Sequence, residues 1–166
     1  MIVRLADPGK DAREILSGAK DFIRLEPFRP EIMDTIVPRW PQALGNGAIV
    51  RDTVADGHSK YARIATLDGK PIGAGGVIEL WPGVGHTWVL AGEVDPRFAL
   101  RVVKAVLGFL DELQGSGKFH RLQADIRTGF FSAMRFAEIL GFKDEGPMRG
   151  YSSDKTDYRR YSRVRM

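Results

Sequence analysis

The sequence predicts a single α/β domain, residues 1–166, in which a meander of strands is followed by alternating helices and strands. Two observations support this prediction. The 166 residues are 43% hydrophobic and 28% charged, a balance that allows one domain of this length to bury a core. Segments with period-two and period-3.6 apolar spacing alternate along the chain, with no repeat or dividing linker. Their order is strand, two helices, three strands, helix, strand, helix and two strands.

The first quarter of the chain predicts a strand and two helices. Residues 1–5 alternate weakly and predict a short strand. Residues 11–25 predict a helix, because apolar residues recur at i, i+3/i+4 and i+7. Prolines bracket a second, short helix over residues 31–37, and residues 44–47 form a loop signal.

A meander of three strands and a long helix occupy the middle. Residues 61–67 and 70–80 predict two strands joined by Asp68-Gly69, a strong hairpin signal. A turn at Trp81-Pro82-Gly83 leads into an apolar strand over 86–91. Asp95 is then the expected N-cap of the long helix, and Pro96 fits its first position.

The last third predicts a strand, a helix and a strand pair. Residues 120–127 form the strand, because Leu122, Ala124 and Ile126 alternate with polar residues. Residues 130–140 predict a helix that Gly141 ends. Residues 143–166 predict two strands joined near 152–156.

Several function classes are excluded by what the sequence lacks. It has no cysteine, which rules out disulfides, thiolate metal sites and a cysteine nucleophile and fits a reducing compartment. Its histidines, His58, His86 and His120, show no metal-ligand spacing. The start has no signal-peptide pattern, and no apolar run approaches the ~20 residues of a membrane span. We therefore expect a cytoplasmic protein with no metal and no membrane partner.

The net charge of +4 lies entirely in residues 149–166, where six Lys and Arg face two Asp. Three explanations stay open: a basic edge strand that discourages edge-to-edge pairing, a groove for an anionic ligand, or a nucleic-acid contact with tyrosines stacked on bases. No nucleic-acid recognition motif is present, so nucleic acid is not the favoured partner.

The order of elements, ending in Leu140-Gly141-Phe142 and a strand pair, resembles the GNAT N-acetyltransferase superfamily over roughly residues 1–160. The second half is also similar to GNAT-like proteins of tailed phages and prophages, through R-L-Q-A at 121–124 and the spaced residues Trp81, Gly83, Gly85, Trp88, Val89 and Leu90. The resemblance implies a mixed central sheet of about six to seven strands with about four helices. It also implies acetyl-CoA as cofactor and an amine acceptor of unknown identity.

In GNAT enzymes the strand before the long helix binds the pantetheine arm, and a glycine-containing turn then wraps the pyrophosphate with backbone N–H groups. The matching cofactor-binding residues here are Leu90, Ala91, Val94, Arg97, Phe98, Ala99 and Arg101. No glycine follows Gly92, a cap by Asp95 would take up N–H donors, and Pro96 has none. Arg97 and Arg101 can supply cationic contacts instead; the alternative is an ordinarily capped helix with solvated arginines.

The acid–base residues of the family also differ. The tyrosine that many members carry four residues before the glycine of L-G-F is Ala137 here, and the asparagine near the start of that helix is Phe130. Ala133 matches a usual small position. We expect Glu79 or His86 as the catalytic base, with Glu93 as a third candidate and Tyr151 or Tyr158 as the acid. Each of the three bases has an alternative as a solvated or turn residue.

Two functions of different classes follow. One is an N-acyltransferase that moves an acetyl group from acetyl-CoA to an amine. The other is a noncatalytic GNAT-like phage or prophage protein with a degenerate CoA site, acting in a virion or through a protein partner or a second copy of the chain. Anion or nucleic-acid binding through residues 149–166 is the third hypothesis.

Overall fold

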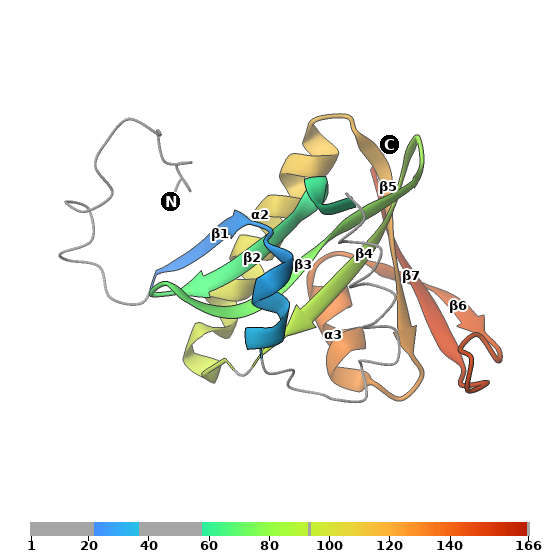
Figure 1. Ribbon diagram of the computed structural model, residues 1–166. Coiled ribbons are helices and arrows are strands. Elements are labelled where there is room, and N and C mark those ends of the chain that lie inside the picture. The colour runs from blue at the N-terminus through green and yellow to red at the C-terminus, as the bar shows by residue number, and fades with distance from the viewer. Residues whose placement is uncertain (1–21, 37–57, 93, 166) are drawn as a thin grey trace.

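The computed structural model describes residues 22–36, 58–92 and 94–165 (Figure 1). Its centre is a seven-stranded sheet in the order β1-β2-β3-β4-β5-β7-β6. β4 and β5 are parallel, and all other neighbouring strands are antiparallel, so the sheet is mixed, as expected. The strands are β1 Ile23–Pro27, β2 Ala62–Leu67, β3 Lys70–Trp81, β4 Gly83–Ala91, β5 Phe119–Arg127, β6 Lys143–Met148 and β7 Tyr158–Val164.

The part of the chain that the structure describes holds fewer α-helices than the sequence predicts for the whole. The described residues hold two α-helices, α2 Ala99–Gly115 and α3 Phe131–Ile139, where about four helices were expected. Short 3-10 helices lie at Pro30–Thr35, His58–Tyr61 and Pro96–Phe98. The first of these overlaps the helix predicted over 31–37, and the expected elements from residue 61 onward are present with shifted ends. Asp95, expected as the N-cap of the long helix, instead caps the 3-10 helix Pro96–Phe98, and α2 begins only at Ala99 without a side-chain cap.

The predicted helix over residues 11–25 is wrong at its end. Residues 23–25 belong to β1, the outermost of the described strands on its side of the sheet, which pairs antiparallel with β2 from Ile23↔Leu67 to Pro27↔Arg63. Exposed Arg24 lies between half-buried Ile23 and Leu25, and this period of two suits a strand whose backbone partners come from β2. The expected strand over 1–5, the earlier part of the helix and the loop over 44–47 lie outside the described residues.

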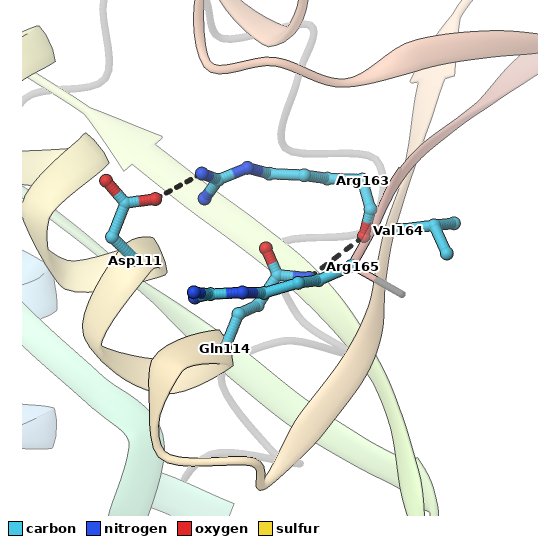
Figure 2. A pocket seen from close by; sticks show the side chains of 5 residues that line it. All are labelled: Asp111, Gln114, Arg163, Val164 and Arg165. Carbon is cyan, nitrogen blue, oxygen red and sulfur yellow. Dashed lines mark hydrogen bonds and ion pairs between the residues drawn. The ribbon is translucent and has the colours of Figure 1, made fainter.

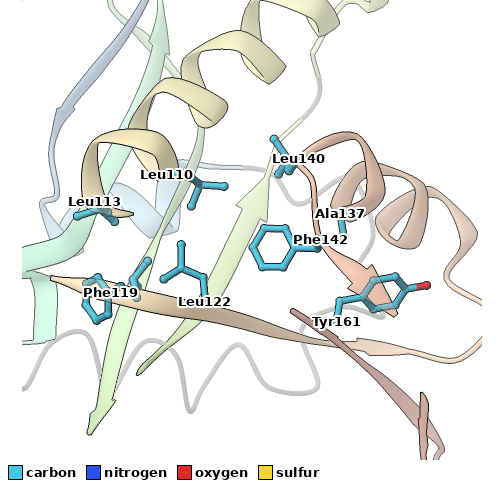
Figure 3. Packing of buried hydrophobic residues seen from close by; sticks show 9 residues of the cluster. Leu110, Leu113, Phe119, Leu122, Ala137, Leu140, Phe142 and Tyr161 are labelled. Carbon is cyan, nitrogen blue, oxygen red and sulfur yellow. The ribbon is translucent and has the colours of Figure 1, made fainter. Parts of the chain in front are cut away.

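Two apolar clusters pack against opposite faces of the sheet. The larger lies under α2 and α3 and comprises Val77, Leu110, Leu113, Phe119, Leu122, Ala137, Leu140, Phe142 and Tyr161. Figure 3 shows its labelled side chains from α2, from α3 and the residues just after it, and from β5 and β7 gathered in one place. The smaller comprises Ile36, Ala62, Ile64, Ala74 and Trp88, with the Phe28 ring edge-on to Trp88 at 5.6 Å between centroids. Helices after β4 and β5 thus cover one face, and the polar residues described below lie on the other.

Candidate functional site

β4 and β5 form a fork. Their parallel pairing runs from Gly83↔Phe119 to His86↔Gln123 and ends there, although β4 continues to Ala91 and β5 to Arg127. At this last pair, the Thr87 hydroxyl donates a hydrogen bond of 3.1 Å to the carbonyl oxygen of Gln123. The Thr87 side chain therefore satisfies the Gln123 carbonyl oxygen at the point where the two strands separate. The fork opens toward the carboxyl ends of both strands.

A polar cluster lies at the fork, on the face opposite α2 and α3. His86 and Gln123 are the last paired residues, and Asp125 follows on the same face, because side chains alternate along a strand. The Asp125 carboxylate accepts hydrogen bonds from Arg160 Nε at 2.9 Å and Nη2 at 3.0 Å, and from the Tyr151 hydroxyl at 2.6 Å. We call His86, Asp125, Arg160 and Tyr151 the fork cluster.

The fork cluster fixes the protonation of its members. Burial lowers the pKa of His86 below its ordinary 6.5, the Asp125 charge opposes this shift, and the Arg160 charge adds to it. The imidazole is therefore neutral near pH 7. Burial would raise the pKa of Asp125, but the hydrogen bonds from Arg160 and Tyr151 outweigh it and lower that pKa. Burial and the Asp125 carboxylate together raise the pKa of Tyr151, so its hydroxyl stays protonated.

In the turn between β4 and α2, the backbone N–H groups of residues 97–99 are engaged within the turn itself. The Asp95 carboxylate accepts a hydrogen bond of 2.9 Å from the backbone N–H of Arg97. The N–H of Phe98 donates to the Asp95 carbonyl at 2.9 Å, and that of Ala99 donates to Pro96. Pro96 has no N–H. At residues 95–99, the part of this turn that the structure describes through these bonds, a carboxylate and engaged N–H groups therefore stand where a phosphate would need open donors.

The side chains of Arg97, in this turn, and Arg101, in the first turn of α2, both lie over the ring of Phe98. The guanidinium of Arg97 pairs with Asp95 at 2.9 Å, and its side chain is 80% exposed. Arg97 and Arg101 each lie over the Phe98 ring, at 5.6 and 5.4 Å from its centroid. Phe98 itself is buried. Two cationic side chains therefore lie near the start of α2, and the charge of Arg97 is partly neutralised by Asp95.

The remaining predicted cofactor-binding residues lie near the fork. Leu90 and Ala91 are on the open stretch of β4, and Leu90 packs against the smaller apolar cluster. Val94 is half-buried between β4 and the Asp95 cap, and Ala99 is exposed at the start of α2.

The structure separates the two predicted catalytic bases. Glu79 pairs with Gly85 across β3 and β4, whereas His86 pairs with Ile78, so the two side chains lie on opposite faces. Glu79 forms an ion pair of 3.0 Å with Lys118, close to the closed end of the fork. Glu93 lies outside the described residues. Ala137 is buried in the larger apolar cluster beside Phe142 (Figure 3).

The basic C-terminal segment is partly neutralised within the fold. Three of its cations form ion pairs with acidic residues that precede it: Arg159 with Asp144, Arg160 with Asp125, and Arg163 with Asp111. These ion pairs neutralise positive charges that would otherwise attract a polyanion. The argument for a nucleic-acid contact is therefore weaker.

A shallow hollow of about 420 Å³ lies between α2 and the end of β7, lined by Asp111, Gln114, Arg163, Val164 and Arg165 (Figure 2). In it Arg163 pairs with Asp111, and Gln114 Nε2 donates to the Arg163 carbonyl at 3.2 Å. Because Arg163 pairs with Leu122 across β7 and β5, the hollow lies beside the paired part of β5, away from the opening of the fork. The side chains that line the hollow bond to one another and so connect α2 to β7.

Within the described ranges, no three His, Cys, Asp or Glu side chains gather in a way that could hold a metal ion. No helix of that part of the chain is long and apolar enough to cross a membrane.

Asp125 and Arg160 are functional candidates that the sequence reasoning missed. The available signal was the polar alternation of Arg121, Gln123 and Asp125 opposite the apolar residues of the same strand. A strand that is polar on one face beside a cleft indicates a site on that face. The partner Arg160 lies 35 residues further along the chain, and only the register of β5 with β7 brings it there.

The order of the sheet, its forked parallel pair and the helices after β4 and β5 define the fold of the GNAT acetyltransferases. A GNAT-family acetyltransferase from Bacillus anthracis is 12% identical with a TM-score of 0.64, over 86% of this chain and 94% of that chain. The ribosomal alpha-N-protein acetyltransferase RimL, in complex with coenzyme A, is 14% identical with a TM-score of 0.65, over 86% and 94%. The microcin self-immunity acetyltransferase MccE, in complex with acetyl-CoA and AMP, is 15% identical with a TM-score of 0.63, over 86% and 92%. No protein-family model matches the sequence, and no curated protein sequence matches it.

Proposed function

We propose that the chain is an N-acyltransferase with acetyl-CoA as acyl donor and an amine as acceptor. The observation that supports this is the fork, where β4 leaves β5 after His86 and opens a strand edge between them. Amide groups of an extended arm can pair with such an edge. When bound, acetyl-CoA supplies an acyl group activated as a thioester.

His86 is the proposed base. It lies at the last paired position of the fork, and its imidazole is neutral because burial lowers its pKa. A neutral ring nitrogen can accept a proton from the attacking amine. Glu79 is less suited to this role, since it is paired with Lys118 on the other face.

The phosphates of the donor would depend on Arg97 and Arg101. The backbone N–H groups of residues 97–99 are engaged within the turn, so cationic side chains would replace them as partners of the phosphates. Such a site lacks the directional N–H groups of a helix start, and we expect affinity in the micromolar range.

The engaged turn and the buried Ala137 also favour a second candidate, a noncatalytic GNAT-like protein that keeps the fold and binds a partner. Asp95 adds negative charge where a pyrophosphate would lie, and Ala137 brings no hydroxyl to the fork. This candidate includes the phage or prophage relationship that the sequence motifs suggest.

Calorimetric titration with acetyl-CoA, beside CoA and 3′-dephospho-CoA at moderate salt, separates the two candidates. Saturable micromolar binding that Arg97→Ala or Arg101→Ala weakens supports the acyltransferase. Absence of binding at millimolar acetyl-CoA contradicts it and favours the noncatalytic protein.

A thiol-release assay with a panel of amines then tests His86. We expect His86→Gln to lower kcat by about 10²-fold or more, the range of a positioned base. His120→Gln is the matched control, because His120 is an exposed histidine near the closed end of the fork and should leave kcat unchanged. Equal loss in both variants would remove His86 from the mechanism.

A further inference from the structure

A tyrosine of the connection between β6 and β7 is hydrogen-bonded to the fork cluster. The Tyr151 hydroxyl donates to Asp125 Oδ2 at 2.6 Å, and the side chain of Asp125 is only 3% exposed. Within the same connection, the Asp157 carboxylate accepts from the Gly150 N–H at 2.7 Å. The position of Tyr151 is therefore set at its hydroxyl and at the backbone beside it.

Tyr151 consequently lies beside the open part of the fork. Asp125 is two residues beyond Gln123, where the pairing with β4 has ended. It shares a face with His86, and each of these two groups shifts the pKa of the other. The charge of Arg160, the other group facing His86, is balanced by Asp125. No net charge from this pair repels a cationic ligand.

The single hydrogen of the Tyr151 hydroxyl is already donated to Asp125. A tyrosine hydroxyl has one hydrogen to donate and can also accept. Since Asp125 is ionised and has no hydrogen of its own, the short bond between them must use the tyrosine hydrogen. The oxygen lone pairs that remain can only accept, so Tyr151 suits an N–H donor better than the role of proton donor considered from the sequence.

The rings beside this hydroxyl favour the same ligand. The centroids of the Tyr151 and Tyr158 rings are 5.4 Å apart, tilted by 55°, and Tyr151 is 47% exposed. Aromatic faces attract ammonium groups. An ammonium or amine group beside Tyr151 can therefore contact a hydroxyl acceptor and the neighbouring tyrosine rings.

We propose that Tyr151 is a specificity residue that binds the amine acceptor by accepting a hydrogen bond from its N–H, and that Asp125 is the positioning residue that fixes the tyrosine hydroxyl. This inference rests on the proposed acyltransferase function, since it names the side chains that recognise that reaction's acceptor.

The test compares two probes in the absence of any acyl donor: 2-phenylethylamine, and its N,N,N-trimethyl derivative, which keeps the charge and ring but has no N–H. NMR titration of the full chain follows the tyrosine ring signals. We expect the amine to bind about tenfold more tightly than the trimethyl probe, the ratio that one hydrogen bond to a charged group gives. Tyr151→Phe should abolish this preference. Tyr158→Phe, which also removes one hydroxyl and keeps the ring, should retain it.

A second variant tests Asp125 itself. In Asp125→Asn the pKa of Tyr151 should fall toward its ordinary value, because the carboxylate that helps to raise it is gone, and the preference for the amine should weaken. Asp144→Asn is the control, because Asp144 pairs with Arg159 in a similar way on β6.

Equal affinity for both probes, no binding of the amine at millimolar concentration, or an unchanged preference in Tyr151→Phe overturns the inference. Amine binding as expected in a chain that does not bind acetyl-CoA would instead refute the proposed function alone. Transfer with an acceptor KM that Tyr151→Phe leaves unchanged would refute the role of Tyr151 alone.

Discussion

Replacing Gly85 by alanine should destabilise the closed end of the fork. Gly85 pairs with Leu122 in the parallel part of β4 and β5 and faces the larger apolar cluster. A Cβ there would lie 2.3 Å from Val77 Cγ1, 3.1 Å from Phe119 Cε1 and 3.2 Å from Leu122 Cδ2. These three side chains are at most 1% exposed, so they have no open space into which to move.

The size of the effect follows from two opposing contributions. Overpacking a dense core costs about 1–3 kcal/mol. Alanine also restricts the unfolded chain relative to glycine, which returns about 0.4–1 kcal/mol. The net loss is about 1–2 kcal/mol, which corresponds to a fall in Tm of roughly 2–8 °C for a chain of this length.

Thermal and urea unfolding of Gly85→Ala and Gly108→Ala measure this difference. Gly108 is the matched control, because it is exposed on α2. Apart from its chain neighbours and the adjacent helix backbone, no described atom lies within 4 Å of the position that an alanine methyl group would take there. Alanine at this position should stabilise the helix by about 0.5–1 kcal/mol. A Gly85→Ala protein as stable as the parent, or two variants with the same shift, would refute the packing argument.

Three further results are expected. Thr87→Val removes the hydrogen bond to the Gln123 carbonyl and should cost about 0.5–1.5 kcal/mol in urea unfolding; no loss would mean that the hydroxyl does not hold the fork. Arg121 first, and then Ser162, lower the pKa of Glu145 from 4.5 to about 2. Its contribution to stability is therefore complete above pH 4.5 and is lost as the pH falls toward 2, so the stability gap between the parent and Glu145→Gln should close over that range. Asp95→Ala frees the Arg97 N–H and removes a negative charge; calorimetry should then show severalfold tighter CoA binding, and unchanged affinity would place the phosphates elsewhere.

The elements that the sequence predicts well are those with local signals. The turn Asp68-Gly69 specifies the β2–β3 hairpin, because the residues that decide it are neighbours. Asp95 and Pro96 likewise mark a helix start, but it is the start of the 3-10 helix Pro96–Phe98 that leads into α2. β1 was mistaken for the end of a helix, since its backbone partners lie in β2, more than 35 residues away in the chain.

The same distinction applies to the site. His86 was a candidate from its place at the start of a strand, but its environment comes from Asp125, Arg160 and Tyr151, which belong to β5, β7 and the β6–β7 connection. Nothing local links these residues. The engaged turn at Asp95 was predictable, because a cap and the proline after it act within four residues.

Chemical-shift mapping of the backbone amides during titration with acetyl-CoA tests the central claim most directly. If the fork holds the acyl donor, the largest shifts fall on residues 87–91 of β4 and 124–127 of β5, and the paired residues 83–85 change little. Shifts confined to the basic residues 149–165 that fade with added salt, or no shifts at millimolar acetyl-CoA, would contradict the account.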